Sequence, residues 1–397
     1  MAKRGLDDID VTGARVLVRV DFNVPIEQGI DGLAQYTHRL KASLPTIDHL
    51  RSKGARTIIC SHLGRPKGKV VEGLRMAPVG EQLSLMLGTE AVCVGDCIGP
   101  PVEDAISSLD RGDVLVLENL RFHPGEEAND PDFSRGLARL AALFVMDAFA
   151  VAHRAHASTV GVPHLLPTAA GILVQQEVKM LGKVLGSPDR PLAALLGGAK
   201  VEDKIRVLDN LLTRVDRLFI GGGMANAFLQ AQGYSAGASK ANEDDVGFAR
   251  RILERAERRG MSVHLPTDVI VADKFGGDAQ NIKSVSVDKV PDGWHVMDVG
   301  PTTAEAFALS LKECKTVVWN GPMGVFEYAP FSQGTRTIAS GLACSEGVVI
   351  VGGGSTAEVV EEMDLANWMA HVSTGGGASL EFLEGKELPG LAAIPDA

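Results

Sequence analysis

The sequence predicts an α/β protein with two Rossmann-like domains, each a parallel β-sheet covered by helices on both faces. Three observations support this fold class. The chain of 397 residues is long for a single hydrophobic core. Short apolar runs rich in Val, Ile and Leu recur roughly every 25 to 45 residues, which is the usual spacing of βα units. Helical patterns lie between many of these runs, and that alternation is typical of parallel sheets buried on both faces.

The predicted strands are the apolar runs themselves. In chain order they occupy residues 15–20, 56–60, 113–119, 142–149, 192–198, 217–223, 315–322 and 348–354.

Two helical patterns organise the rest of the chain. In 201–212 an apolar stripe repeats at helical spacing from Val201 to Leu212. A second amphipathic pattern fills 172–187 and stops at Gly186 and Pro188, where apolar strands resume. We interpret this segment as a connecting helix between domains at 1–171 and 188–377.

Composition excludes several classes of protein. The net charge of −11 disfavours non-specific binding to nucleic acid. No run of 18 apolar residues is present, so no membrane span is predicted, and the N-terminus has no apolar segment typical of a secretory signal. Five cysteines without a CxxC pair indicate free thiols in a reducing compartment. We therefore predict a cytoplasmic protein.

Basic residues of the first half directly follow apolar runs, where open α/β sheets bind ligands. Each basic residue by itself could simply be a solvated surface residue. Together they favour a binding site for a small phosphorylated acid, because guanidinium groups match phosphate and carboxylate oxygens. The histidines also suggest a metal site, although no HExxH or Cys/His spacing supports it. The residues are Arg39, His62, Arg65, Arg121, His123, His153, Arg154 and His156.

The second half contains five glycine-rich corners at strand ends, which suit either tight turns or backbone contact with an anion. Lys200 and Lys204 lie four residues apart at the start of a predicted helix, where their mutual repulsion and the helix dipole disfavour them. A bound polyanion would reverse that cost. There is no GxxxxGK[ST] motif, while 352–357 fits a loose GxGxxA, so a nicotinamide enzyme and an inactive binding scaffold remain alternatives.

Taken together, these segments resemble the phosphoglycerate kinase family. "RVDFNVP", "SHLGRP", "ENLRFHPGEE", "LLGGAKVEDKI", "VWNGPMGVFE" and "HVSTGGGASLE" occur in the family's order and at similar spacing. The resemblance implies reversible, Mg²⁺-dependent transfer of a phosphoryl group from 1,3-bisphosphoglycerate to ADP, giving 3-phosphoglycerate and ATP. It also implies a monomer with a hinge cleft between a phosphoglycerate-binding and a nucleotide-binding domain, and a tail at 378–397 that packs back on the first domain.

The resemblance also implies roles for individual residues. Phosphoglycerate would be held by Asp21, Asn23, Arg39, His62, Leu63, Gly64, Arg65, Arg121 and Arg154. The nucleotide would be held by Lys200, Lys204, Gly221, Gly222, Asn320, Glu327, Gly353, Gly354, Ser355 and Thr356. Catalysis would depend on Arg39, Lys200 and the backbone N–H groups of Gly375, Gly376 and Gly377.

The chain departs from the family pattern at Ser355, where the family usually has an Asp associated with the nucleotide's Mg²⁺. The sequence "STAE" fits a capping box, in which Ser355 caps the helix and Glu358 reaches back. A hydroxyl is a poorer Mg²⁺ ligand than a carboxylate. We therefore expect an active enzyme with a weaker Mg²⁺ dependence, in which waters, nucleotide phosphates or Glu358 complete the metal's coordination.

Overall fold

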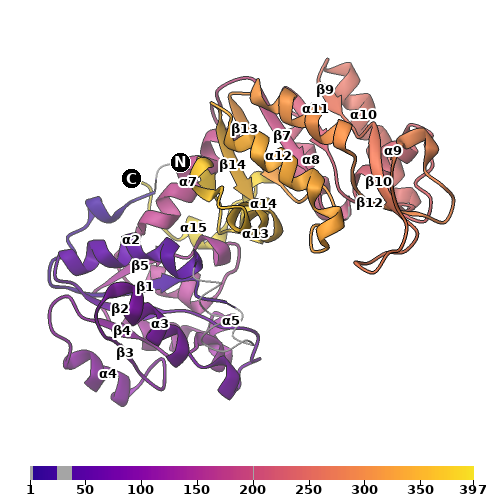
Figure 1. Ribbon diagram of the computed structural model, residues 1–397. Coiled ribbons are helices and arrows are strands. Elements are labelled where there is room, and N and C mark those ends of the chain that lie inside the picture. The colour runs from indigo at the N-terminus through magenta and orange to yellow at the C-terminus, as the bar shows by residue number, and fades with distance from the viewer. Residues whose placement is uncertain (1–2, 25–37, 200) are drawn as a thin grey trace. The chain divides into compact units, whose positions relative to one another are not determined.

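A computed structural model of the chain describes residues 3–24, 38–199 and 201–397 (Figure 1). It divides into two compact units. Unit 1 comprises Met1–Lys179 and Glu387–Ala397, and unit 2 comprises Met180–Lys386. The chain passes from one unit to the other within α7 (Ile172–Leu185). In the described part of the chain, no helix is long and apolar enough to span a membrane.

Unit 1 is built on a parallel six-stranded sheet. The strand order is β3 (Ala91–Cys93), β4 (Val114–Val116), β2 (Arg56–Cys60), β1 (Arg15–Val20), β5 (Leu143–Asp147) and β6 (Thr168–Ala170). Near-continuous burial of β1, β2 and β4 explains why their sequences are apolar without alternation. The sheet is accompanied by helices α2 (His38–Ser52), α3 (Ala77–Leu87), α4 (Pro100–Ser107), α5 (Pro124–Glu127) and α6 (Pro131–Ala138).

The C-terminal segment completes unit 1. Its helix α15 (Pro389–Ala392) contacts the loop after β5, where the Gly390 N–H donates to the Ala152 carbonyl at 2.8 Å. Lys3 and Asp396 form an ion pair at 2.8 Å, so the two ends of the chain lie side by side.

Unit 2 contains a second parallel sheet. Its order is β15 (His371–Val372), β14 (Val348–Gly352), β13 (Thr316–Asn320), β7 (Leu192–Leu196), β8 (Arg217–Ile220) and β9 (Ser262–His264). All eight apolar runs expected to be strands are strands, which confirms the predicted fold class. The helices are α8 (Ile205–Leu211), α9 (Ala225–Ala231), α10 (Glu243–Arg258), α11 (Pro301–Lys312), α12 (Gln333–Ala343), α13 (Gly354–Glu362) and α14 (Gly377–Leu383).

Unit 2 also carries an antiparallel sheet that the sequence analysis missed. It has the order β11 (Ile282–Ser286), β10 (Asp268–Ala272) and β12 (His295–Val299). The outer strand β11 is largely exposed and its sequence is mixed, so it lacks the apolar run by which the other strands were found.

Candidate active site

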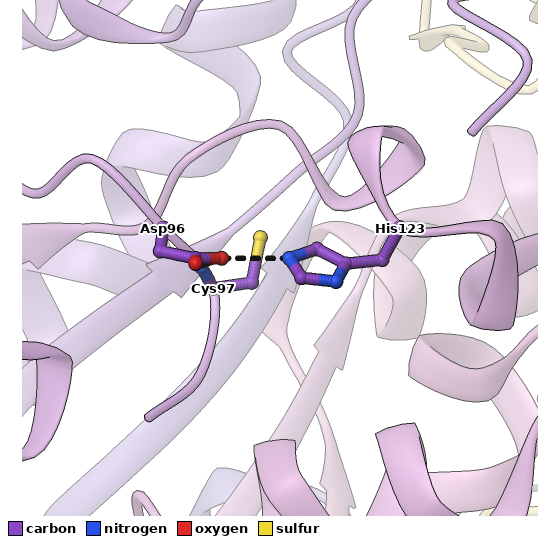
Figure 2. Close-up of side chains that lie close together, drawn as sticks. All are labelled: Asp96, Cys97 and His123. Atoms are coloured by element: carbon purple, nitrogen blue, oxygen red, sulfur yellow. Dashed lines mark hydrogen bonds and ion pairs between the residues drawn. The ribbon is translucent and has the colours of Figure 1, made fainter. Parts of the chain in front are cut away.

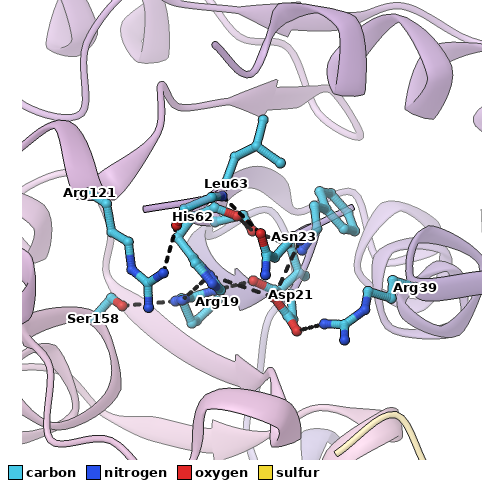
Figure 3. Close-up of polar contacts among 12 residues, drawn as sticks. Arg19, Asp21, Asn23, Arg39, His62, Leu63, Arg121 and Ser158 are labelled. Atoms are coloured by element: carbon cyan, nitrogen blue, oxygen red, sulfur yellow. Dashed lines mark hydrogen bonds and ion pairs between the residues drawn. The ribbon is translucent and has the colours of Figure 1, made fainter. Parts of the chain in front are cut away.

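The predicted binding residues of unit 1 follow four neighbouring strands, β4, β2, β1 and β5, at their carboxyl ends. Because the strands are parallel, these loops meet at one edge of the sheet. Figure 3 shows the resulting polar network around Asp21, His62 and Arg121.

Asp21 lies at the start of the loop after β1 and is almost fully buried. Its carboxylate accepts a hydrogen bond from the Arg39 guanidinium on the first turn of α2. The Asn23 N–H donates to Asp21 Oδ1 at 3.3 Å, and Asn23 Oδ1 accepts from the Gly64 N–H at 2.8 Å. The loops after β1 and β2 are thus fixed to each other.

His62 is buried at the centre of the network, with 3% of its surface exposed. Its Nδ1 lies 3.1 Å from Arg19 Nη2, and because arginine can only donate, Nδ1 is the acceptor. Burial, followed by the charges of Arg19, Arg121 and Arg154, lowers the pKa of His62 well below its ordinary value of 6.5. His62 is therefore neutral, and its 3.6 Å approach to Asp21 is not an ion pair at physiological pH.

Arg121 lies in the short 3₁₀ turn Leu120–Phe122 after β4 and is 3% exposed. Its Nη1 donates to the Gly64 carbonyl at 2.7 Å, and its Nε lies 3.2 Å from Glu127. Buried Nη2 finds no acceptor among the described residues. Burial lowers the pKa of Arg121, which marks the energetic cost of holding this cation away from water. A buried guanidinium N–H without a partner is ready for an anionic ligand.

Asn119 orders the loops around Arg121. Its side-chain oxygen accepts the N–H groups of Leu63 and Arg121, both at 3.1 Å, and its Nδ2 donates to the Leu63 carbonyl at 2.7 Å. Asn119, which no sequence motif singled out, thus positions the main chain around the site.

A buried chain of hydrogen bonds from Arg19 through Ser158 to Glu126 was also not predicted. Arg19 Nε donates to Ser158 Oγ at 2.8 Å, and Ser158 Oγ donates to Glu126 Oε1 at 2.6 Å. Glu126 is fully buried, and burial raises its pKa although Arg19 and Ser158 act in the opposite direction. Arg19 was the detectable signal, because it is a charged residue inside an otherwise apolar strand.

Among the remaining basic residues, Arg154 and His156 lie near the arginine network, whereas Arg65 and His123 lie outside it. The charge of Arg154 contributes to the lowered pKa of His62, and Arg154 Nε donates to His153 Nε2 at 3.3 Å. His156 is near Glu126 at 3.8 Å, yet burial and the arginines lower its pKa to about 4. Arg65 is exposed on the loop after β2. His123 lies apart from this network and pairs with Asp96 at 2.6 Å.

The neutral state of His62 gives a pH-dependent stability. Below pH 6.5 the unfolded chain protonates this histidine while the folded chain does not, so the free energy of unfolding falls as pH decreases. In His62→Gln we expect this fall between pH 6.5 and about pH 5 to be shallower, by at most about 1.4 kcal/mol per pH unit. Urea denaturation followed by circular dichroism at each pH measures it.

His164→Gln is the matched control, since His164 is an exposed histidine of the same unit. Its pH profile should follow the wild type. An unchanged slope in His62→Gln would mean that His62 does not resist protonation.

Unit 2 contains a pocket of about 720 Å³ between the ends of its parallel strands and the antiparallel sheet. Three residues expected to hold the nucleotide line it, namely Gly222, Glu327 and Ser355. Val296 and Asp298 of β12 also face the pocket. Asp298 is buried, and its burial raises its pKa to about 7.

Lys204 is buried beside this pocket. Its ammonium donates to the carbonyls of Gly197 at 2.6 Å and Asn320 at 2.7 Å, which join the ends of β7 and β13. Helix α8 begins at Ile205 after a 3₁₀ turn at Glu202–Lys204, and Lys204 is its N-cap residue, so Lys204 lies at the start of the helix as expected. Lys200 lies outside the described residues.

The buried Asn320 side chain has a hydrogen-bond donor that no described residue uses. Its Nδ2 has no hydrogen-bond acceptor within the described part of the chain. Thr356 is also buried, but its hydroxyl accepts the Gly321 N–H at 2.8 Å, so it supports the loop after β13.

The glycine corners fall into two kinds. A Cβ on Gly222 would lie 2.6 Å from the Gly198 nitrogen, and Gly221 is similarly crowded by Met323, so close packing explains both glycines. By contrast, a Cβ on Gly354 or Gly376 would meet no atom within 4 Å. The Gly375 N–H donates to Ser373 Oγ at 3.1 Å, and Gly377 begins α14.

Ser355 does not cap its helix. Helix α13 begins at Gly354 and its N-cap is Gly353, with φ of 90° and no side-chain cap. The capping-box prediction is therefore wrong, because the positive φ available to glycine lets the helix start two residues earlier, at Gly354. Ser355 is exposed on the first turn of α13 and faces the pocket.

A buried arginine network with an unpartnered guanidinium N–H, together with a pocket bordered by glycines, fits an α/β enzyme that acts on phosphorylated substrates. The sequence profile described as phosphoglycerate kinase matches residues 6–386. The chain is 54% identical to phosphoglycerate kinase of Moorella thermoacetica and 50% identical to that of Pelotomaculum thermopropionicum, each over 396 residues and the full length of both proteins.

Solved structures agree with this match. The chain superposes on phosphoglycerate kinase from Coxiella burnetii with a TM-score of 0.86 and 40% identity. For the enzyme from Pyrococcus horikoshii the TM-score is 0.84 and the identity 31%, and both comparisons cover 98% of each chain. The chain belongs to the phosphoglycerate kinase family. It is a phosphotransferase with a carboxyl group as acceptor, and catalyses reversible phosphoryl transfer between 1,3-bisphosphoglycerate and ADP.

Proposed function

We propose that the arginine network of unit 1 is the phosphoglycerate site. The observation that carries this assignment is the buried Nη2 of Arg121, which has no acceptor within the described residues. A phosphate or carboxylate oxygen of the ligand supplies that acceptor. The residues proposed to bind phosphoglycerate are Asp21, Asn23, Arg39, His62, Arg65, Arg121 and Arg154, with the main chain of Leu63 and Gly64.

Within this site the side chains have different roles. Arg39 and Arg121 donate to anionic oxygens, while neutral His62 donates from Nε2, since its Nδ1 is occupied by Arg19. Asp21 orients Arg39 through their ion pair. The acceptor carboxylate of 3-phosphoglycerate is already ionised at neutral pH, so no general base is required.

We propose that the pocket of unit 2 binds the nucleotide, in accordance with its volume and its lining by Gly222, Glu327 and Ser355. Asn320 Nδ2 donates to the bound nucleotide, and Lys204 contributes positive charge at the strand ends. Gly353 and Gly354 place backbone N–H groups at the start of α13, where anions are favoured. Gly221 and Thr356 support the pocket walls.

Transfer requires neutralisation of charge on the moving phosphoryl group. We assign this role to Arg39, Lys200 and the main chain of Gly375, Gly376 and Gly377. The open space at Gly376 is consistent with the approach of a ligand to this backbone.

The ADP or ATP of this reaction is proposed to bind as its Mg²⁺ complex. Mg²⁺ retains waters and phosphate oxygens and needs only one or two protein ligands, so the oxygen donors around the pocket fit it. Ser355 lines the pocket, and Glu358 lies one turn further along α13. Burial, followed by the charges of Glu362 and Glu327, raises the pKa of Glu358, so three carboxyl groups lie near this end of the pocket. These residues would hold the metal–nucleotide complex, in which Mg²⁺ would supply positive charge to the phosphates.

Ser355→Asp is expected to lower the Mg²⁺ concentration needed for half-maximal rate, because it adds a carboxylate where Mg²⁺ is proposed to bind. The helix N-terminus also favours an acidic residue at this position. Ser355→Asn is the control, since it has similar size without the charge. A Mg²⁺ midpoint that is the same in both variants and the wild type would contradict a metal role for this position.

We further propose a cytoplasmic monomer that acts on small molecules and binds neither nucleic acid nor membrane. The described cysteines Cys60, Cys93, Cys97, Cys314 and Cys344 are all free thiols, in keeping with a reducing compartment. Sedimentation equilibrium tests the oligomeric state, for which we expect the mass of one 41.9 kDa chain.

The direct test of the proposed nucleotide and metal requirement is ATP-dependent phosphorylation of 3-phosphoglycerate, coupled to NADH oxidation, across a Mg²⁺ titration. The proposal predicts turnover that saturates with Mg²⁺. Equal turnover in the presence of excess chelator would contradict the requirement for a metal–nucleotide complex.

A further inference from the structure

A second cluster of reactive side chains lies in unit 1, apart from the arginine network (Figure 2). It consists of Asp96 and Cys97, on the loop after β3, and His123, just before α5. One potential ligand atom of each residue lies within 4.8 Å of the others. Among the described residues this is the only group of three or more His, Cys, Asp or Glu side chains with metal-binding proximity.

The three side chains are held by their neighbours. His123 Nε2 is 2.6 Å from Asp96 Oδ1, and the imidazole stacks on Phe133 with 4.8 Å between ring centroids. Asp96 Oδ1 also accepts the Cys97 N–H at 2.6 Å. Cys97 is fully buried, and its thiol donates to the Glu118 carbonyl at 3.0 Å. The sulfur, nitrogen and oxygen donors are therefore held close together by hydrogen bonds that an ion would replace.

The identity of these donors selects the kind of ion. Thiolate, imidazole and carboxylate are all ligands of Zn²⁺, whereas a thiolate disfavours hard cations such as Mg²⁺. Four ligands at Zn²⁺ distances lie about 3.4 Å apart in a tetrahedron. The three donor atoms lie within 4.8 Å of one another, so side-chain shifts of about 1 Å bring them to this spacing. The Asp96 side chain is 54% exposed and His123 is 29% exposed, which leaves both room to adjust.

We propose that Asp96, Cys97 and His123 form a binding site for one divalent cation of the Zn²⁺ class, with water as the fourth ligand. On binding, the Cys97 S–H bond is replaced by a sulfur–metal bond, and the proton leaves to solvent. The hydrogen bond that His123 Nε2 donates to Asp96 Oδ1 is exchanged for two bonds to the ion, and the Nε2 proton passes through solvent to Nδ1, so the imidazole stays neutral. The Glu118 carbonyl loses its thiol donor, so the site competes with an existing buried contact.

The test is a titration of the chelator-treated, full-length chain with Co²⁺, followed by optical spectroscopy. Co²⁺ occupies Zn²⁺ sites, and a coordinated thiolate gives a charge-transfer absorption in the near ultraviolet. We expect one equivalent of Co²⁺ to produce this band and Zn²⁺ to displace it. Cys97→Ser should abolish the band, and His123→Gln should weaken binding by at least about tenfold.

Cys93→Ser is the matched control, because Cys93 is an exposed cysteine four residues before Cys97. It should retain both the band and the affinity. His123 is only partly buried, so His123→Gln remains informative if Cys97→Ser fails to fold. No thiolate band in the wild type, a band that persists in Cys97→Ser, unchanged affinity in His123→Gln, or loss of the band in Cys93→Ser would each overturn the proposal.

Discussion

Arg121→Met is expected to lower kcat/KM for 3-phosphoglycerate about 100-fold. The variant removes a buried guanidinium whose unpartnered Nη2 we assign to the ligand, and a charged hydrogen bond to an anion contributes about 1.5–3 kcal/mol. Methionine fills most of the side-chain volume, so the main changes are the loss of charge and of the bond to the Gly64 carbonyl. Steady-state kinetics with varied 3-phosphoglycerate measure the effect.

The control for this variant is Arg135→Met in the same unit. Arg135 is half-exposed on α6 and pairs with Asp132, so its loss should leave kcat/KM nearly unchanged. A reduction of similar size in both variants would indicate general destabilisation or a field effect, and would contradict a direct contact between Arg121 and phosphoglycerate.

Lys204→Met is expected to destabilise unit 2 by about 3 kcal/mol and to weaken ADP binding. The variant removes two charged hydrogen bonds that join the ends of β7 and β13 through Gly197 and Asn320. All three tryptophans, Trp294, Trp319 and Trp368, belong to unit 2. Urea unfolding followed by tryptophan fluorescence therefore reports on this unit.

Lys240→Met is the matched control, since Lys240 is a lysine of the same unit that lines the pocket but is exposed. It should leave the free energy of unfolding within about 0.5 kcal/mol of the wild type. If Lys204→Met unfolds at the same urea concentration as the wild type, then its buried contacts do not stabilise the strand ends.

The central strands were predictable because burial on both faces leaves them almost entirely apolar. For example, 15–20 and 56–60 coincide with β1 and β2. The edge strands β3 and β15 have only three and two residues, too few to give a pattern. The strand β11 is largely exposed and polar, so it has no apolar run from which a strand could be predicted.

The positions of His62 and Arg121 near each other follow from parallel strands, whose carboxyl ends share one edge of the sheet. The roles of individual polar atoms do not follow from sequence. The apolar run around Arg19 predicts a buried strand. It does not indicate that the Arg19 side chain donates hydrogen bonds to His62 and Ser158. Such partners come from segments far apart in the chain.

The glycines show a second limit of sequence analysis. Gly222 is required by backbone packing, whereas Gly354 has open space around it, although both belong to triple-glycine corners. Likewise, "STAE" satisfies a capping pattern, but Gly353 supplies the start of α13. Only the three-dimensional contacts distinguish a glycine that permits packing from one that leaves room for a ligand.

The central claim is that unit 1 binds phosphoglycerate and unit 2 binds the nucleotide. Calorimetric binding of 3-phosphoglycerate and of ADP to the wild type, Arg121→Met and Lys204→Met tests it most directly. We predict that Arg121→Met loses at least about tenfold in affinity for 3-phosphoglycerate and keeps its ADP affinity, while Lys204→Met shows the reverse. Weaker binding of both ligands by each variant, or of the opposite ligand, would contradict the assignment.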